Sequence, residues 1–359
     1  MPPNFRPALV ACALGCAAPA SSGDVTFYGE LNPTLLIADD GVRDTDMLGD
    51  SSADPSRIGL YIHNKFGDID ARFNFETALG LRRTGTKTQF NSPSMVDLGR
   101  DMIRKVDLRL RGSFGTVSVG QGNMASDGIT SVDLSGTKPA AYVSVGTPAA
   151  GIRFTDAVSG AVSNVSIGSA FRSYDGERLM RLRYDSGRED GFSISFSVGT
   201  EVIDDDDDMT SRDLTLRYQG ERAGIAYRAA LGLIHSDRPG AASERDTVGS
   251  FSAIDAGGRS LTVAMGARRN AGNYGYVKLG YVTDIWALGS TAVSIDYYNG
   301  DDIRAAQTSS RSVGLALVQN VAKADLDLSL AVRSYDFSET GGRQFRRAET
   351  ITLGASWKF

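Results

Sequence analysis

Apolar and polar residues alternate at every second position in many short segments of the chain. In residues 56–63, for example, Ile58, Leu60 and Ile62 share one face of an extended backbone. Period two is the spacing of a strand with two different faces, because successive side chains point in opposite directions. The same alternation recurs in residues 70–79, 105–111, 179–185, 192–198, 214–219, 225–233, 261–265, 276–282, 293–298, 313–317, 325–333 and 351–359. The pattern predicts an all-β chain.

The predicted strands are joined by short and long connections in turn. The short connections are residues 65–68, 113–115, 186–191, 220–222 and 321–323. The long, polar connections are residues 38–55, 80–102, 202–212, 235–245 and 336–348. Aromatic residues gather near the strand ends, at Phe27, Tyr28, Phe66, Phe114, Phe192, Tyr281, Tyr297, Trp357 and Phe359. Short turns at one rim, long loops at the other and aromatic girdles are typical of a transmembrane barrel.

A soluble β-sandwich is the main alternative, since its strands alternate as well. No run of 18 apolar residues follows residue 20, so the sequence predicts no membrane-spanning helix. A closed barrel is the other structure that pairs all of its backbone groups inside a bilayer. The unequal connections favour the barrel over the sandwich.

The first 20 residues have the composition of a secretory signal peptide. Arg6 is their only charge, a run of apolar and small residues follows, and Ala18-Pro19-Ala20 matches a cleavage site. We therefore expect residues 1–20 to be removed and residues 21–359 to form the barrel domain. Cys12 and Cys16 both lie in this segment, and each also resembles a lipoprotein attachment site, which we keep as a minor alternative.

Composition excludes several classes of protein. The chain has 38 Lys+Arg and 43 Asp+Glu, a net charge of -5, which argues against a nucleic-acid partner. Two cysteines and two histidines are too few for a disulfide framework or a histidine-rich metal site. His63 falls on the polar face of a strand and His235 opens a loop, and neither has a neighbouring serine-and-carboxylate pattern. We therefore expect no enzyme.

Several motifs resemble the general porins of Gram-negative bacteria. They are SRIGL at 56–60, IDARFNFET at 69–77, RLRGSFGTVSVG at 109–120, RYDS at 183–186 and GFS at 191–193. Residues 124–129 and 134–137 look most like the alphaproteobacterial branch. The terminal Phe359, two positions after Trp357, resembles the aromatic signal that the barrel assembly machinery recognises in this family.

The resemblance implies a 16-stranded antiparallel barrel that is usually a homotrimer in the outer membrane. Up to 18 segments have strand character, and the surplus pair is 151–155 and 162–171. We prefer 16 strands, with residues 123–177 as one long third loop folded into the lumen, and keep 18 as the alternative. The loop at 80–102 occupies the place of the one that reaches over a neighbouring subunit in trimeric relatives.

A barrel of this size encloses a water-filled channel, which the third loop is expected to narrow. The predicted constriction places Asp127 and Asp133 of this loop opposite five arginines of the wall, Arg57, Arg72, Arg109, Arg181 and Arg183. Opposed charges across the gap would set a transverse field and bias ion permeation. Relatives often have Gly-Arg where this chain has Gly120-Gln121, which leaves the ion preference open.

The expected function is passive diffusion of small hydrophilic solutes and ions through the outer membrane, with no cofactor. A substrate-selective channel and a non-conducting adhesion or structural barrel are the alternatives. Residues 204–208 are five consecutive aspartates, so Asp204, Asp206 and Asp208 are a weak candidate site for loosely bound Ca²⁺. A solvated loop whose charges repel one another is the favoured interpretation of this run.

Overall fold

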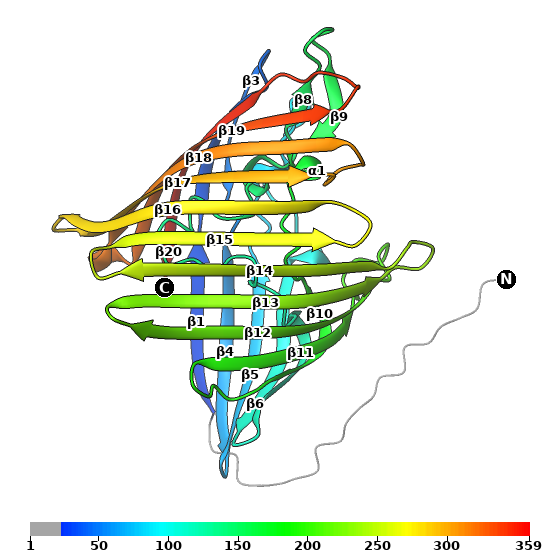
Figure 1. Ribbon diagram of the computed structural model, residues 1–359. Coiled ribbons are helices and arrows are strands. Elements are labelled where there is room, and N and C mark those ends of the chain that lie inside the picture. Colours follow the sequence, from blue (N-terminus) through cyan, green and yellow to red (C-terminus); the bar gives the residue numbers. More distant parts are fainter. Residues whose placement is uncertain (1–22) are drawn as a thin grey trace.

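Residues 23–359 are described by this computed structural model, and the expected signal peptide lies outside them. The chain folds as a closed antiparallel β-barrel (Figure 1). Its strands are β1 (Asp24–Leu31), β2 (Pro33–Asp39), β3 (Asp44–Asp50), β4 (Arg57–Phe66), β5 (Ile69–Ala78), β6 (Ile103–Gly112), β7 (Gly115–Asn123), β8 (Arg153–Thr155), β9 (Val162–Ser166), β10 (Arg178–Asp185), β11 (Phe192–Thr200), β12 (Thr210–Arg222), β13 (Ile225–Asp237), β14 (Glu244–Asp255), β15 (Arg259–Arg268), β16 (Asn273–Trp286), β17 (Gly289–Asp301), β18 (Thr308–Val321), β19 (Leu326–Glu339) and β20 (Ala348–Lys358).

Sixteen strands form the barrel wall, because the first two are each interrupted. β1 and β2 continue one another across Asn32, and β3 and β4 do so across residues 51–56. The two interruptions lie side by side, since the Asn32 N–H donates to Ser56 Oγ at 2.8 Å. β20 pairs with both β1 and β2 and closes the barrel. β8 and β9 pair with each other in a separate sheet, so 16 strands is confirmed and 18 is wrong.

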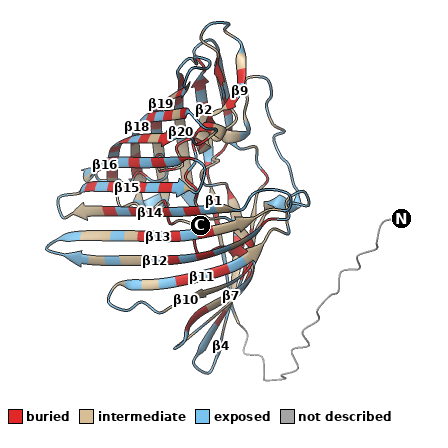
Figure 2. Ribbon diagram, turned by 45° about the vertical axis from the view of Figure 1, so that its right-hand side comes forward, coloured by how far each residue is buried: buried red, intermediate tan, exposed pale blue. Residues whose placement is uncertain are grey.

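Apolar side chains point outward and polar ones point inward along the strands. Phe73, Leu108 and Leu353 are 36%, 39% and 45% exposed, which a residue between two stacked sheets would not be. On the same strands, Asn74 and Asp107 are buried. Figure 2 shows this as alternating exposed and buried bands along β12 to β16. The sheet therefore presents an apolar surface to lipid and a polar surface to the lumen.

The two rims differ as the sequence predicts, although several loops are shorter than expected. The predicted loop 38–55 contains β3, because residues 44–50 pair with β2 in a tight hairpin. The predicted loop 336–348 is reduced to residues 340–347, since β19 continues to Glu339. β13 and β14 likewise extend to Asp237 and from Glu244, which shortens the predicted loop 235–245.

Little of the chain is helical. The short helices are α1 (Ile167–Ala170) and the 3-10 turns η1 (Thr84–Thr86), η2 (Arg100–Met102), η3 (Thr147–Ala149) and η4 (Ala322–Ala324). In residues 23–359, no helix has the length and apolar character needed to cross a membrane.

The long segment between β7 and β10, residues 124–177, is called the constriction loop below. It contains β8, β9, η3 and α1, and its Val143, Ile152, Phe154 and Ile167, each at most 2% exposed, belong to an apolar cluster that it shares with the barrel wall. This shared cluster attaches the loop to the inside of the barrel, where it can narrow the channel.

Candidate pore constriction

The constriction loop packs against the inner face of β13–β20, which we call the packed wall. Tyr335 Oη donates to the Val145 carbonyl at 2.8 Å, and Tyr298 Oη donates to the Arg172 carbonyl at 2.8 Å. The rings of Phe171 and Tyr298 lie 5.4 Å apart, within one apolar cluster that joins loop and wall. This side of the lumen is filled with protein.

A buried ion pair fixes the loop to the same wall. Lys278 of β16 lies 2.5 Å from Asp133, and the two side chains are 0% and 3% exposed. The Lys278 ammonium also donates to the Ala141 carbonyl at 2.7 Å and to the Ser135 and Thr137 hydroxyls. The prediction that Asp133 lines the opening is therefore wrong, because its carboxylate faces the packed wall.

The remaining space lies against β4–β7 and β10–β12, which we call the basic wall. A cavity of about 590 Å³ is bordered by these strands. Eight cationic side chains and two carboxylates line it. They are Arg72, Lys105, Arg109, Arg111, Arg181, Arg183, Arg188 and Arg217, with Asp107 and Asp185. Four of the five predicted wall arginines thus border one cavity, and Arg57 does not.

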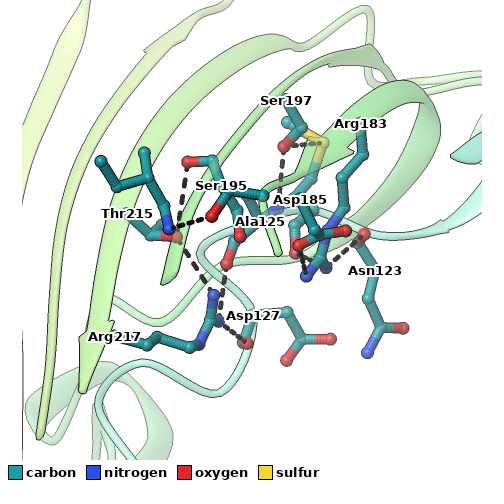
Figure 3. Close-up of polar contacts among 12 residues, drawn as sticks. Asn123, Ala125, Asp127, Arg183, Asp185, Ser195, Ser197, Thr215 and Arg217 are labelled. Carbon is teal, nitrogen blue, oxygen red and sulfur yellow. Dashed lines mark hydrogen bonds and ion pairs between the residues drawn. The ribbon is translucent and has the colours of Figure 1, made fainter. Parts of the chain in front are cut away.

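Two arginines of the basic wall hold the root of the constriction loop (Figure 3). Arg183 Nη1 donates to the Met124 carbonyl at 2.9 Å, while its other nitrogens bind Asp185. Arg217 Nη2 donates to the carbonyls of Ala125 and Asp127 at 2.7 and 3.1 Å. Their hydrogen bonds go to the loop backbone, so these guanidinium groups position the loop as well as lining the cavity. The alternation in residues 214–219 could have identified Arg217 as an inward residue.

Carboxylate and hydroxyl groups complete this attachment. Asp213 accepts hydrogen bonds from the Ser126 N–H, at 2.7 Å, and from the Ser197 hydroxyl. Ser197 Oγ in turn accepts from the Ala125 N–H at 2.7 Å. The loop root is thus bound by donors and acceptors of three neighbouring strands.

Arg181 is almost fully buried in the wall rather than free in the channel. Its guanidinium lies 2.6 Å from Asp107 and donates to the carbonyls of Gly120 and Asn123 at 2.6 and 2.8 Å. Gly120 has a φ of +118° inside β7, and a Cβ there would overlap the Val106 carbonyl. Glycine is needed at this position because L side chains rarely adopt such a φ.

Arg57 is surrounded by carboxylates. It forms ion pairs with Glu30 and Asp54, and its Nε lies 3.9 Å from Glu76. Glu76 also binds Arg104 at 2.7 Å. Much of the Arg57 charge is therefore balanced locally, which distinguishes it from Arg72 and Arg109 of the cavity.

Arg72 and Arg109 belong to the members of the basic wall that form no ion pair in residues 23–359. They are paired across β5 and β6, so two like charges stand directly opposite each other. The Arg72 guanidinium lies 4.6 Å from the ring centroid of Tyr61, a cation–π contact. Within the described residues, no carboxylate lies within ion-pair distance of either arginine. Their charges therefore remain available to a passing anion.

Two carboxylates of the constriction loop, Asp127 and Asp175, lie outside the lining of the cavity. Burial raises the pKa of Asp127, whose carboxylate interacts with the charges of Arg178 and Arg183. Asp175 accepts the N–H groups of Gly128 and Thr130 at 3.1 and 3.2 Å. Burial, and then repulsion by Asp127, raise the pKa of Asp175 to about 6. Sequence reasoning missed Asp175. It lies near the end of the loop sequence, whereas Asp127 lies near its start, and the fold brings the two together.

The acidic run 204–208 binds neighbouring loops. Arg100 of η2 holds Asp205 at 2.9 Å, and Arg238 holds Asp207 at 3.2 Å. In the described part of the chain, no cluster of three metal-ligating side chains occurs, so Asp204, Asp206 and Asp208 do not converge on one point.

The loop at residues 79–102 turns toward its own barrel at Gln89. The Gln89 amide donates to the Arg153 carbonyl at 2.6 Å and accepts from the Arg153 N–H at 3.1 Å. It thereby joins this loop to the constriction loop. Other residues of the loop, Met95 and Leu98 among them, are exposed.

Phe359 and Trp357 lie at the closure of the barrel. The Phe359 backbone exchanges hydrogen bonds with Gly29 of β1 at 2.9 and 3.1 Å, and its ring lies 5.1 Å from that of Trp357. The terminal residue is thus built into the seam between the first and last strands.

A closed barrel with a lipid-facing apolar surface and a polar lumen narrowed by an inward loop defines an outer-membrane channel. A family model described as Gram-negative porin matches residues 8–340. The chain belongs to this family, and it forms an outer-membrane channel for passive diffusion.

Solved structures support the same fold. The chain is similar to an anion-selective porin from Comamonas acidovorans, with 14% identity, a TM-score of 0.60 and coverage of 94% of this chain and 100% of that one. It is also similar to OprB of Pseudomonas putida, with 12% identity, a TM-score of 0.63 and coverage of 94% of both chains. A trimer form of OmpT from Vibrio cholerae has 15% identity and a TM-score of 0.56, over 94% of this chain and 100% of that one. No match to a curated protein was found.

Proposed function

We propose that the conducting path runs between the root of the constriction loop and the basic wall, and that it favours anions. The observation that carries this proposal is the lining of the cavity, with eight cationic side chains against two carboxylates. Arg72 and Arg109 add to this bias, because neither charge is paired. Fixed cations beside a narrow aqueous path raise the local concentration of anions.

A general pore fits the lining better than a sugar-selective one. Of the described residues that border the cavity, Tyr61 is the single aromatic side chain. A channel specific for sugars needs a succession of aromatic faces along its path. The channel is therefore proposed to pass small hydrophilic solutes with a weak charge preference.

Transport without catalysis is proposed from the contacts of the two histidines. His235 Nε2 lies 3.1 Å from Asp237, and its Nδ1 accepts from Arg245 at 3.2 Å. His63 packs against the edge of Tyr61, with ring centroids 5.8 Å apart. Both side chains have structural partners rather than a nucleophile to activate.

A homotrimer is proposed from family membership and from the trimer form recorded for OmpT of Vibrio cholerae. The apolar outer surface of the barrel can be covered by lipid or by a neighbouring subunit.

The built-in position of Phe359 supports the proposal that the barrel assembly machinery recognises this residue. Chemical cross-linking in membranes tests the trimer, and a Phe359→Ala variant tests the assembly signal.

The ion preference is tested in planar bilayers under a salt gradient, with Arg72→Gln and Arg109→Gln combined. The parent reversal potential should indicate anion preference, and the double variant should shift toward cations. Arg311→Gln, which removes an outward-facing arginine of β18, should leave the potential unchanged. An unchanged potential in the double variant would contradict the proposal. Saturation by one solute class would indicate a selective channel, and absence of any conductance would indicate an adhesion barrel.

A further inference from the structure

A second cavity lies in the lumen beside the short turn between β4 and β5. It has a volume of about 480 Å³ and is bordered by β4, β5 and β6, which are neighbours in the wall (Figure 1). Of the described residues that line it, none belongs to the constriction loop. Arg72, Arg109 and Arg111 border both this cavity and the one at the basic wall. It is called the turn-side cavity below, and it is a separate place in the same lumen.

The turn-side cavity has an excess of positive charge. Four cationic side chains, two carboxylates and one histidine line it. They are Arg72, Arg109, Arg111 and Lys65, with Asp24, Asp70 and His63. Among the described residues, none of the four cations forms an ion pair with a carboxylate. With the histidine neutral, four positive charges against two negative ones leave an excess of two, which matches one doubly charged anion.

Three of these groups stand side by side in one row of the sheet. His63 of β4 is paired with Arg72 of β5, and Arg72 is paired with Arg109 of β6. The Cβ atoms of directly opposite residues lie about 5 Å apart, so both guanidinium groups can reach one anion. Like charges in this arrangement repel each other and destabilise a sheet. An anion bound between them would offset this repulsion.

One donor of this row is buried without a partner. Within residues 23–359, the Arg72 Nε is hidden from solvent and has no acceptor. The protein uses other arginines of the basic wall itself, since Arg181 binds Asp107 and Arg183 binds Asp185. A buried donor without an acceptor is costly, so its presence at a cavity points to a ligand that accepts from it.

An aromatic stack holds Arg72 in place. The Arg72 guanidinium lies 4.6 Å from the ring centroid of Tyr61. The Tyr61 ring lies 4.5 Å from that of Tyr28, with an angle of 15° between the two planes. Tyr28 Oη in turn donates to Glu76 at 2.8 Å. The donor is thus oriented before an anion arrives, which reduces the side-chain freedom lost on binding.

The same row of the sheet connects the turn-side cavity with the root of the constriction loop. Arg109 is paired with Ser118 of β7, and Ser118 is paired with Arg183 of β10. The Arg183 guanidinium holds the loop root at the Met124 carbonyl. Polar inward side chains therefore line each step from the loop root to His63. An anion that passes the loop root along this wall meets the turn-side cavity next.

We propose that the turn-side cavity binds a tetrahedral dianion of the phosphate class, with Arg72 and Arg109 as the main donors. Donors reach the cavity from three strands and from two successive inward positions of β6. A tetrahedral anion offers oxygens in several directions, whereas one guanidinium fork already satisfies a carboxylate. This inference rests on the proposed conducting path and adds a saturable site to its general preference for anions.

The test measures block of the single-channel chloride current by inorganic phosphate at about pH 8, where a phosphate group is a dianion. Ionic strength is held constant. The parent current should fall with phosphate and level off as the site fills. Succinate, a dianion with two planar carboxylates, should need about ten-fold more for half-block, because it cannot accept from all of the donors at one point.

A charge-conserving variant separates the site from the ion preference of the pore. Arg72→Lys combined with Arg109→Lys keeps both charges but loses the planar forks and the stacking contact. The reversal potential of this variant should still indicate anion preference, whereas half-block should need about ten-fold more phosphate than in the parent. Arg311→Gln, on the outer face of β18, is the control and should match the parent in both measurements.

Glycerol phosphate distinguishes the two sources of this chemistry. Block at the same or a lower concentration than inorganic phosphate assigns the site to phosphate monoesters, and weaker block assigns it to the inorganic ion. Either result retains the site. Equal phosphate block of the parent and the double lysine variant would overturn the proposal, and so would equal block of the parent by succinate and phosphate.

Heat-modifiable gel migration shows whether the double lysine variant is a folded barrel. If it is not, His63→Gln and Arg111→Lys are measured singly, and parent-like phosphate block in both would overturn the proposal. An anion-preferring parent that phosphate does not block would overturn this inference alone. A cation-preferring parent would contradict the proposed function, whatever the effect of phosphate, so the two proposals fail separately.

Discussion

Asp133 and Lys278 stand 145 positions apart in the sequence and form an ion pair that is almost completely hidden from solvent. The contact joins the constriction loop to β16. Because it lies behind the loop, its role is to hold the loop against the packed wall. The transverse field of the channel must arise from other residues.

We expect Lys278→Met to release this part of the loop. The substitution leaves the Asp133 carboxylate buried without its partner, which typically costs about 3–5 kcal/mol. Hydrogen exchange of residues 128–140 should become faster, and single-channel current should become noisier. Replacing both residues, with Asp133→Leu added, should restore part of the protection. Faster exchange in the double variant than in Lys278→Met would contradict this interpretation.

The pKa of Asp175 predicts a dependence of ion preference on pH. Its value of about 6 exceeds the ordinary 3.8, so the folded loop favours the protonated form. The contribution of Asp175 to loop stability is therefore greatest below pH 3.8 and is lost as pH rises toward 6. Below pH 6 the loop also carries less negative charge, so the anion preference should increase. Reversal potentials measured from pH 7 to pH 5 check this expectation.

Asp175→Asn is the control for the pH experiment, because it removes the titration while retaining an oxygen acceptor for the Gly128 N–H. This variant should show a flatter pH dependence over the same range. A titration identical to that of the parent would assign the effect to another group.

Gly314 lies on β18, between β17 and β19, and leaves room for a buried ion pair that joins these two flanking strands. It is paired with Asp296 on one side and with Arg333 on the other, and those two side chains lie 2.7 Å apart. A Cβ at Gly314 would overlap the Arg333 guanidinium. Gly314→Ala should therefore destabilise the barrel by about 1–3 kcal/mol, measured by the urea midpoint. Gly275→Ala, where a Cβ meets nothing within 4 Å, should lie within 1 kcal/mol of the parent.

The barrel could be predicted from the sequence because lipid and water impose opposite requirements on alternate residues. Ile58, Leu60 and Ile62 revealed the outer face of a strand without knowledge of its partners. The break of the first strand at Asn32 could not be predicted, since it depends on a hydrogen bond to Ser56 in the neighbouring strand. The branch of the family within the alphaproteobacteria stays a prediction.

The constriction could be predicted only in part. The inward direction of Arg72 and Arg109 follows from alternation, but the partners of Arg183 depend on the path of the constriction loop. The sequence places Asp133 in the loop but does not show which side of the loop packs against β16, so its burial against Lys278 could not be predicted. An inward lysine between Tyr276 and Gly280 on a strand was the available signal.

The central claim is that Arg109 faces a conducting lumen while its neighbour Leu108 faces lipid. The most direct measurement is modification of Arg109→Cys and Leu108→Cys by a bulky, water-soluble methanethiosulfonate during single-channel recording. A stepwise fall in current is expected for Arg109→Cys, with no change for Leu108→Cys or for the parent chain. A fall in current for Leu108→Cys with none for Arg109→Cys would contradict it.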